Sequence, residues 1–157
     1  QITRPNQVWS TDITYVRMRQ GFLYLVAVID WFSRYVLAWQ LSNQMSTDFC
    51  LEALNRCWRH GSPDIFNSDQ GSQFTSNRFV ECLLARDVKV SMDGKGRCLD
   101  NVYIERLWRS VKYEEIYLKD YSDGREASSE LGRYFDFYNE RRLHSSLEYR
   151  TPAKLYC

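Results

Sequence analysis

The sequence lacks the features that mark secreted, zinc-binding or membrane proteins. Its five cysteines are odd in number and contain no CxxC pair, which indicates neither a disulfide framework nor a zinc finger. Two histidines are too few and too far apart for a histidine-based metal site. No stretch approaches the roughly 18 apolar residues that span a membrane, and QITRPNQVWS lacks the regions of a secretory signal. We expect a soluble, cytoplasmic protein.

A strong charge of either sign is also missing. The chain carries 21 Lys and Arg against 20 Asp and Glu, a net charge of +1, so composition alone does not mark a dedicated DNA-binding domain. Its 157 residues, 44% of them hydrophobic, can bury one sizeable core. Basic residues gather in the last quarter of the sequence. We therefore expect one domain over residues 1–141, followed over residues 142–157 by an irregular basic tail packed on the domain or extending from it.

The order of apolar patterns predicts an α/β fold. Between Val8 and Leu41, short β-branched runs broken at residues 19–21 and 30–34 predict three antiparallel strands. Further on, the patterns predict helices over residues 47–60, 77–86, 99–117 and 122–141, strands over 64–67 and 88–92, and a loop over 94–96. Three strands followed by alternating helices and strands indicate a mixed five-stranded sheet flanked by helices.

Three acidic residues stand out within this pattern. Asp12 lies inside the first predicted strand, Asp69 directly follows the fourth in NSDQGSQF, and Glu105 lies in a predicted helix in DNVYIERLW. Each has an ordinary explanation when taken singly: an edge residue, a turn residue and a surface helix residue. Together they have the composition of a metal site, because Mg²⁺ and Mn²⁺ prefer carboxylate oxygens, and two such ions stabilise both oxygens of an in-line phosphodiester cleavage.

The same residues carry a family resemblance. Asp12, Asp69 and Glu105, with 35 residues between the last two, resemble the DDE signature of transposases and retroviral integrases. The segments around Asp69 and Glu105 resemble that superfamily, and YNERRLHSSLEYRTPAKLY resembles the C-terminal signature of bacterial insertion-sequence transposases. The resemblance implies a ribonuclease H-like fold, two Mg²⁺ or Mn²⁺ ions held by the three acids, and DNA cleavage followed by strand transfer.

The resemblance also implies partners. A transposase acts on the terminal repeats of its element and on target DNA, works as a homodimer or larger multimer on DNA, and associates with the nucleoid. Members of the family carry N-terminal DNA-binding segments that this sequence does not include, so we interpret the chain as a catalytic core.

Further residues are candidates for DNA contact. Lys112 follows Glu105 by seven residues and Asn101 precedes it by four, so both share its predicted helix face. The glycine-flanked loop and the basic tail offer further phosphate donors. The full set is Lys112, Asn101, Gln73, Lys95, Arg97, Arg141, Arg142 and His144. For each, an ordinary solvated or structural role stays open.

Two other functions stay open at this point. A nuclease of the same fold would use similar carboxylates but would hydrolyse DNA without joining strands. A decayed element would keep only a DNA-binding or assembly role, although the three intact acids argue against decay.

Overall fold

The computed structural model describes residues 1–92 and 101–157. The predicted loop over residues 94–96, together with Lys95 and Arg97, lies outside these ranges.

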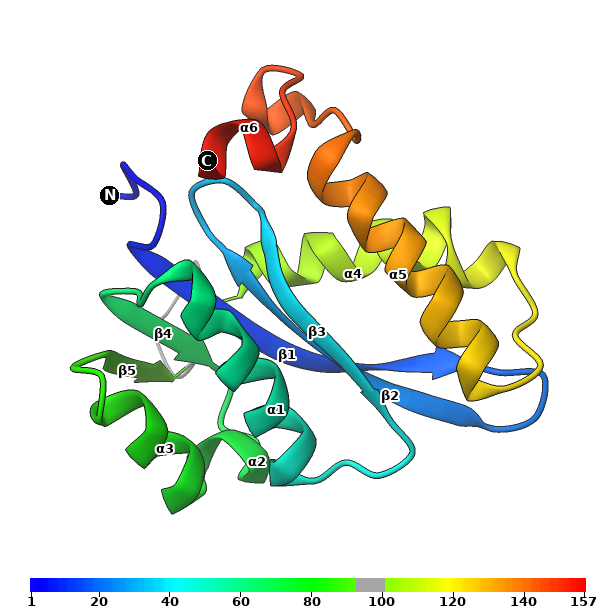
Figure 1. Ribbon diagram of the computed structural model, residues 1–157, viewed down its shortest axis with the longest axis horizontal. Helices are drawn as coiled ribbons and strands as arrows, with labels where there is room; N and C mark the ends of the chain where they lie inside the picture. The colour runs from blue at the N-terminus through cyan, green and yellow to red at the C-terminus, as the bar shows by residue number, and fades with distance from the viewer. Residues whose placement is uncertain (93–100) are drawn as a thin grey trace.

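A five-stranded mixed sheet forms the centre of the protein (Figure 1). The strands β1 (Val8–Arg17), β2 (Phe22–Asp30) and β3 (Val36–Ser42) form the predicted antiparallel meander. Two short strands, β4 (Ile65–Ser68) and β5 (Lys89–Met92), are parallel to β1, and the sheet order is β3-β2-β1-β4-β5. The predicted mixed five-stranded α/β fold is confirmed.

The register of β1 against β4 sets the position of two of the predicted acids. Only Val8 to Ser10 of β1 pair with β4, and Ser10 lies opposite Asn67. Two residues farther along each parallel strand come Asp12 and Asp69. They therefore lie side by side at the edge where β4 ends.

Helices cover both faces of this sheet. The four long ones are α1 (Thr47–Cys57), α3 (Asn77–Leu84), α4 (Val102–Glu114) and α5 (Gly124–Glu140), each within a predicted helical segment. Two of the predicted helix ends are instead 3₁₀ turns, namely η1 (Trp58–His60) and η2 (Ile116–Leu118), and a further short helix, α2 (Ser72–Thr75), precedes α3. The α2 turn was not predicted.

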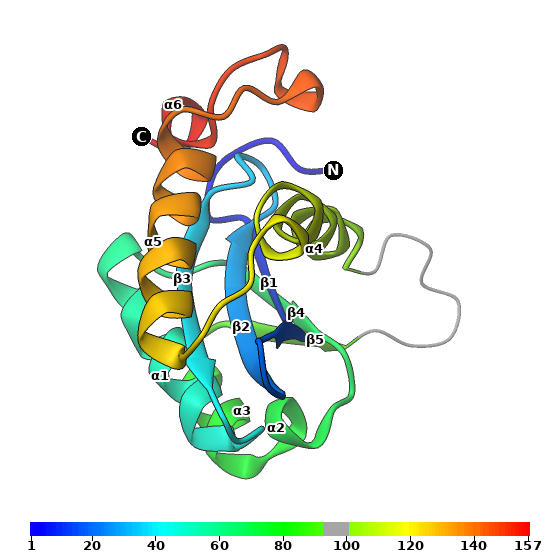
Figure 2. The same cartoon turned by 90° about the vertical axis from the view of Figure 1, so that its right-hand side faces the viewer.

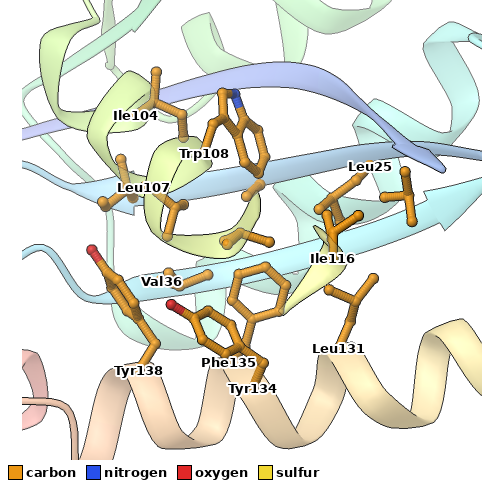
Figure 3. Packing of buried hydrophobic residues seen from close by; sticks show 14 of the residues in the cluster. Leu25, Val36, Ile104, Leu107, Trp108, Ile116, Leu131, Tyr134, Phe135 and Tyr138 are labelled. Atoms are coloured by element: carbon orange, nitrogen blue, oxygen red, sulfur yellow. The ribbon is translucent and has the colours of Figure 1, made fainter. Parts of the chain in front are cut away.

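The alternation of strand side chains divides the core into two clusters. Leu25, Ala27 and Ile29 of β2 point to the face covered by α4 and α5, where large side chains such as Trp108 and Phe135 fill the space (Figure 3). The intervening residues of β2 point to the opposite face, against α1 and α3. In Figure 1, α4 and α5 lie on one side of the sheet and α1 and α3 on the other, and Figure 2 gives the same arrangement turned by a quarter. Burial on both sides fixes the register of the strands.

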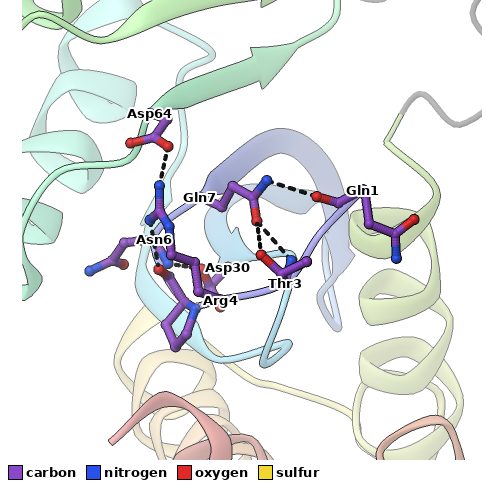
Figure 4. Close-up of polar contacts among 8 residues, drawn as sticks. Gln1, Thr3, Arg4, Asn6, Gln7, Asp30 and Asp64 are labelled. Carbon is purple, nitrogen blue, oxygen red and sulfur yellow. Dashed lines mark hydrogen bonds and ion pairs between the residues drawn. The ribbon is translucent and has the colours of Figure 1, made fainter.

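Polar contacts fix the residues that precede β1 (Figure 4). The buried carboxylate of Asp30 accepts a hydrogen bond of 2.8 Å from the backbone N–H of Asn6. Arg4 forms an ion pair with Asp64, and the side-chain oxygen of Gln7 accepts a hydrogen bond from the backbone N–H of Thr3. These contacts place the start of β1, and with it Asp12, relative to the turn before β4.

The expectation of an irregular tail was wrong. The segment after Arg141 contains a 3₁₀ turn, η3 (Ser145–Leu147), and a helix, α6 (Pro152–Tyr156), and His144 bridges to Arg150 through the backbone. Leu147 and Pro152 are buried. The order comes from these tertiary contacts, because the segment itself has no helical or strand periodicity. No helix in the described ranges has the length and apolar character needed to cross a membrane.

Candidate active site

The side chains of Asp12 and Asp69 meet at the end of β4. They are close enough to share a hydrogen bond, and both are only partly exposed. Burial, and then the charge of Asp69, raise the pKa of Asp12 from its ordinary 3.8 to about 6, while the N–H groups of Ile13 and Trp108 act in the opposite direction. Two carboxyl groups in contact disfavour double ionisation, so a proton or a cation between them is stabilising.

Asp69 is held by the turn that follows it. The backbone N–H of Gly71 donates to Asp69 Oδ1 at 2.8 Å. A Cβ at Gly71 would lie 3.0 Å from Asp69 Oδ1 and 3.2 Å from Gln73 Oε1. The glycine therefore lets the backbone approach the carboxylate closely.

Glu105 lies in the first turn of α4, on the helix that packs beside Asp12. Trp108, three residues later on the same helix, donates from Nε1 to Asp12 Oδ2 at 3.2 Å. Glu105 itself is exposed, and among residues 1–92 and 101–157 no three acidic, histidine or cysteine side chains come together at metal-binding spacing. The structure thus brings Asp12 and Asp69 together, and places Glu105 on the neighbouring helix without completing the group.

The donor set fits a hard divalent cation. Asp12 within β1 and Asp69 directly after β4 offer carboxylate oxygens whose positions are set by the strand register, and a cation would offset the burial and the repulsion that raise the pKa of Asp12. On the adjacent helix α4, Glu105 is the acidic residue nearest in sequence to Trp108, the residue that donates a hydrogen bond to Asp12.

The residues flanking Glu105 differ in accessibility. Lys112 is half-buried, forms no ion pair with a described residue, and burial lowers its pKa. Asn101 is 4% exposed and adopts a left-handed conformation with φ of 50°, so it precedes the helix and does not share the exposed face of Glu105. Its Oδ1 has no hydrogen-bond partner among the described residues.

Two of the predicted tail donors have internal partners. Arg142 makes a two-point ion pair with Glu114 of α4, with distances of 2.8 Å and 2.6 Å. His144 is buried against the Tyr138 ring, 4.7 Å between centroids, and burial and Arg142 lower its pKa to about 4. It is therefore neutral near pH 7. Arg141 is exposed and has no ion-pair partner in the described part of the chain.

A pocket of about 310 Å³ opens beside the two carboxylates. Its lining includes Asp12, Asp69 and Gln73, together with Tyr15 and Tyr24 of the β1–β2 hairpin. The two tyrosines and Trp108 are the site residues that sequence reasoning missed. The spacing of three residues from Glu105 to Trp108 was a usable signal, since such residues lie on one side of a helix.

Two family profiles, each described as an integrase core domain, match residues 2–98 and residues 86–152. The chain belongs to the integrase core domain family. The transposase for insertion sequence element IS904 of Lactococcus lactis is 36% identical over 96% of this chain and 61% of its own length. The putative transposase InsK for IS150 of Escherichia coli is 33% identical over 97% and 55%. This integrase core domain thus spans little more than half the length of these relatives.

Solved structures share the fold. The HTLV-2 integrase catalytic core domain in complex with magnesium, in its dimeric form, superposes with a TM-score of 0.75 at 18% identity, covering 98% of both chains. The simian T-cell lymphotropic virus intasome contains a chain that superposes with a TM-score of 0.83 at 18% identity, covering 99% of this chain and 57% of that one. This integrase core domain therefore has the ribonuclease H-like fold.

Proposed function

We propose that the chain is the catalytic core of a DNA transposase that cleaves phosphodiester bonds at the ends of a mobile element and joins the freed 3′ ends to target DNA. The observation that carries the proposal is the meeting of Asp12 and Asp69 where β4 ends, beside the helix that bears Glu105. The family membership and the names of the relatives support the same reaction.

Asp12, Asp69 and Glu105 are the proposed ligands of Mg²⁺ or Mn²⁺, two ions per site. When bound, these ions stabilise negative charge on the attacking and leaving oxygens. The chain itself orients the donors: Trp108 holds Asp12, and the N–H of Gly71 holds Asp69. In the first step a water oxygen attacks phosphorus and a 3′ oxygen leaves as a hydroxyl. In the second step that hydroxyl attacks a target phosphorus and displaces the target's own 3′ oxygen.

For DNA contact we propose the accessible members of the predicted set. Lys112 and Arg141 have no ion-pair partner in the described part of the chain, and Gln73 lines the pocket beside the carboxylates. Asn101, Arg142 and His144 are left out, because the first and last are buried and Arg142 is paired with Glu114. Lys95 and Arg97 stay proposed contacts that lie outside the described residues.

We also propose that the core works as a multimer on DNA, since both ends of an element must be joined together. The HTLV-2 integrase catalytic core domain, which shares this fold, has been solved in a dimeric form. Full transposition in this account also uses the part of the relatives' length that lies outside the region matched by this chain.

The test is metal binding by calorimetry, followed by nicking and joining of pre-cleaved element ends in Mg²⁺ or Mn²⁺. The comparison is between the wild type, Asp69→Asn and a control, Asp136→Asn, whose carboxylate is exposed on α5. We expect metal binding and joining in the wild type and the control only. Nicking without joining favours the nuclease, and no metal binding even with DNA present favours an inactive DNA-binding remnant.

A further inference from the structure

The β1–β2 hairpin carries an exposed aromatic cluster close to the carboxylates. Tyr15 and Phe22 are 54% and 50% exposed, and both pack on Tyr24 with ring centroids 5.5 Å and 5.3 Å apart. Figure 1 shows this hairpin extending well past α1 and α2, the helices on that side of the sheet. Exposed aromatic rings gathered in one place mark a binding surface more often than a structural one.

The cluster is continuous with the candidate active site. Ile13, Tyr15 and Tyr24 lie on one face of the hairpin, and Tyr15 is directly opposite Tyr24 in the register. Both tyrosines line the pocket that also contains Asp12 and Asp69. The exposed Met45, at 42%, adds a further apolar wall. Because side chains alternate along β1, the Asp12 carboxylate points with its partner Ala27 towards α4, whereas Tyr15 and Tyr24 line the pocket from the opposite face of the sheet. A ligand in this pocket would therefore touch the aromatic rings and lie beside Asp69, where β4 ends.

The charges around the pocket restrict what it accepts. Among its described lining residues, the only charged side chains are Asp12 and Asp69, so a phosphate inside the pocket would meet no cation. A neutral, planar, partly polar group suits it better. The tyrosine rings offer stacking faces, and the amide of Gln73 offers both a donor and acceptors.

We propose that this pocket holds an unstacked nucleobase of the nucleotide next to the phosphate on which the carboxylates act, with Tyr15 and Tyr24 as its stacking wall. The inference deepens the proposed function and rests on it for the position of the phosphate. Stacking on aromatic side chains is available to every base, so the pocket positions the strand without reading its sequence. Tyr15 and Tyr24 are positioning residues in this account.

The test measures base binding separately from chemistry. The probe is a short thymidine oligonucleotide with one 2-aminopurine, compared with the same oligonucleotide carrying an abasic site at that position. Affinity and 2-aminopurine quenching are recorded with and without Mg²⁺. We expect the wild type to quench the probe and to prefer it to the abasic strand roughly tenfold.

The variants separate stacking from general damage. Tyr15→Leu and Tyr24→Leu should lose the preference, whereas Tyr24→Phe, which keeps a ring, should retain it. Tyr149→Leu, at a tyrosine that is 69% exposed on the tail, serves as the matched control and should behave as wild type. Thermal unfolding identifies any variant that fails to fold.

Three results would overturn the inference. One is equal affinity of the wild type for the two strands. Another is retention of the preference in both leucine variants. The third is a wild-type dimer in light scattering that Tyr15→Leu converts to a monomer, which would make the cluster a contact between copies of the chain. Cleavage of DNA without base preference contradicts this inference alone, and base preference without cleavage contradicts the proposed function alone.

Discussion

Replacing Asp12 by asparagine should make the metal-free protein more stable while abolishing its metal response. The pKa of Asp12 lies at about 6 in the folded chain against 3.8 ordinarily, a difference equivalent to about 3 kcal/mol. Because the pKa of Asp12 is higher in the folded chain than in the unfolded chain, its contribution to the free energy of unfolding is fully present below about pH 4. That contribution is lost as the pH rises through about 6. An asparagine removes the charge and keeps an acceptor for Trp108 Nε1.

The gain in stability depends on how strongly water already screens the buried Asp12 carboxylate and its repulsion from Asp69. Asp12 is partly exposed, so we expect a stabilisation of about 1–2 kcal/mol at pH 8, falling towards zero near pH 4. Urea unfolding in EDTA, followed by tryptophan fluorescence, measures it at both pH values. The exposed Asp136→Asn provides the baseline. Adding Mg²⁺ should raise the stability of the wild type and of the baseline variant but not that of Asp12→Asn.

One result would refute this reasoning. If Asp12→Asn is less stable than the wild type at pH 8 without metal, then neither the burial of the Asp12 carboxylate nor its contact with Asp69 opposes folding. The raised pKa would then have another origin. A Mg²⁺ response that survives in Asp12→Asn would separately remove Asp12 from the proposed ligands.

Three further predictions concern the surroundings of the carboxylates and the tail. Gly71→Ala should weaken Mg²⁺ binding in calorimetry with unchanged secondary structure, because the new Cβ lies 3.0 Å from Asp69 Oδ1; unchanged affinity would show that the turn yields freely. Trp108→Phe removes the donor to Asp12 and should weaken Mg²⁺ binding more at pH 6.5 than at pH 8, since the pKa of Asp12 rises further; an equal loss at both pH values contradicts this. His144 has a folded pKa of about 4 against 6.5, so up to about 3 kcal/mol of stability should be lost as pH falls from 6.5 to 4. His144→Phe should remove that part of the pH dependence in urea titrations.

The sequence was informative where the fold is determined by local pattern. Alternation between Val8 and Leu41 predicts three strands, and the position of Asp69 directly after an apolar run predicts its place at a strand end. Parallel pairing of β1 and β4 then brings Asp69 beside Asp12. The four-residue helix α2 was beyond prediction, because so short an element contains no full period of apolar residues.

The tail and its charges could not be predicted in the same way. Arg142 resembles a phosphate donor in sequence, and only the folded chain shows that Glu114, 28 residues earlier, is its partner. His144 has a polar neighbourhood in sequence yet is buried against Tyr138. Partners far apart in the chain determine these roles, and no local spacing encodes them.

The ion pair between Arg142 and Glu114 joins the tail to the helix that carries Glu105, and Tyr134 of α5 donates to the same carboxylate at 2.7 Å. Three segments thus converge on one acidic group at the far end of α4 from Glu105. A chain shortened to end at residue 141 would lose the Arg142 guanidinium. Glu114 would then keep the hydrogen bond from Tyr134 but lose its ion pair. The tail therefore stabilises the helix that bears Glu105, the third proposed metal ligand, and removing the tail should loosen α4.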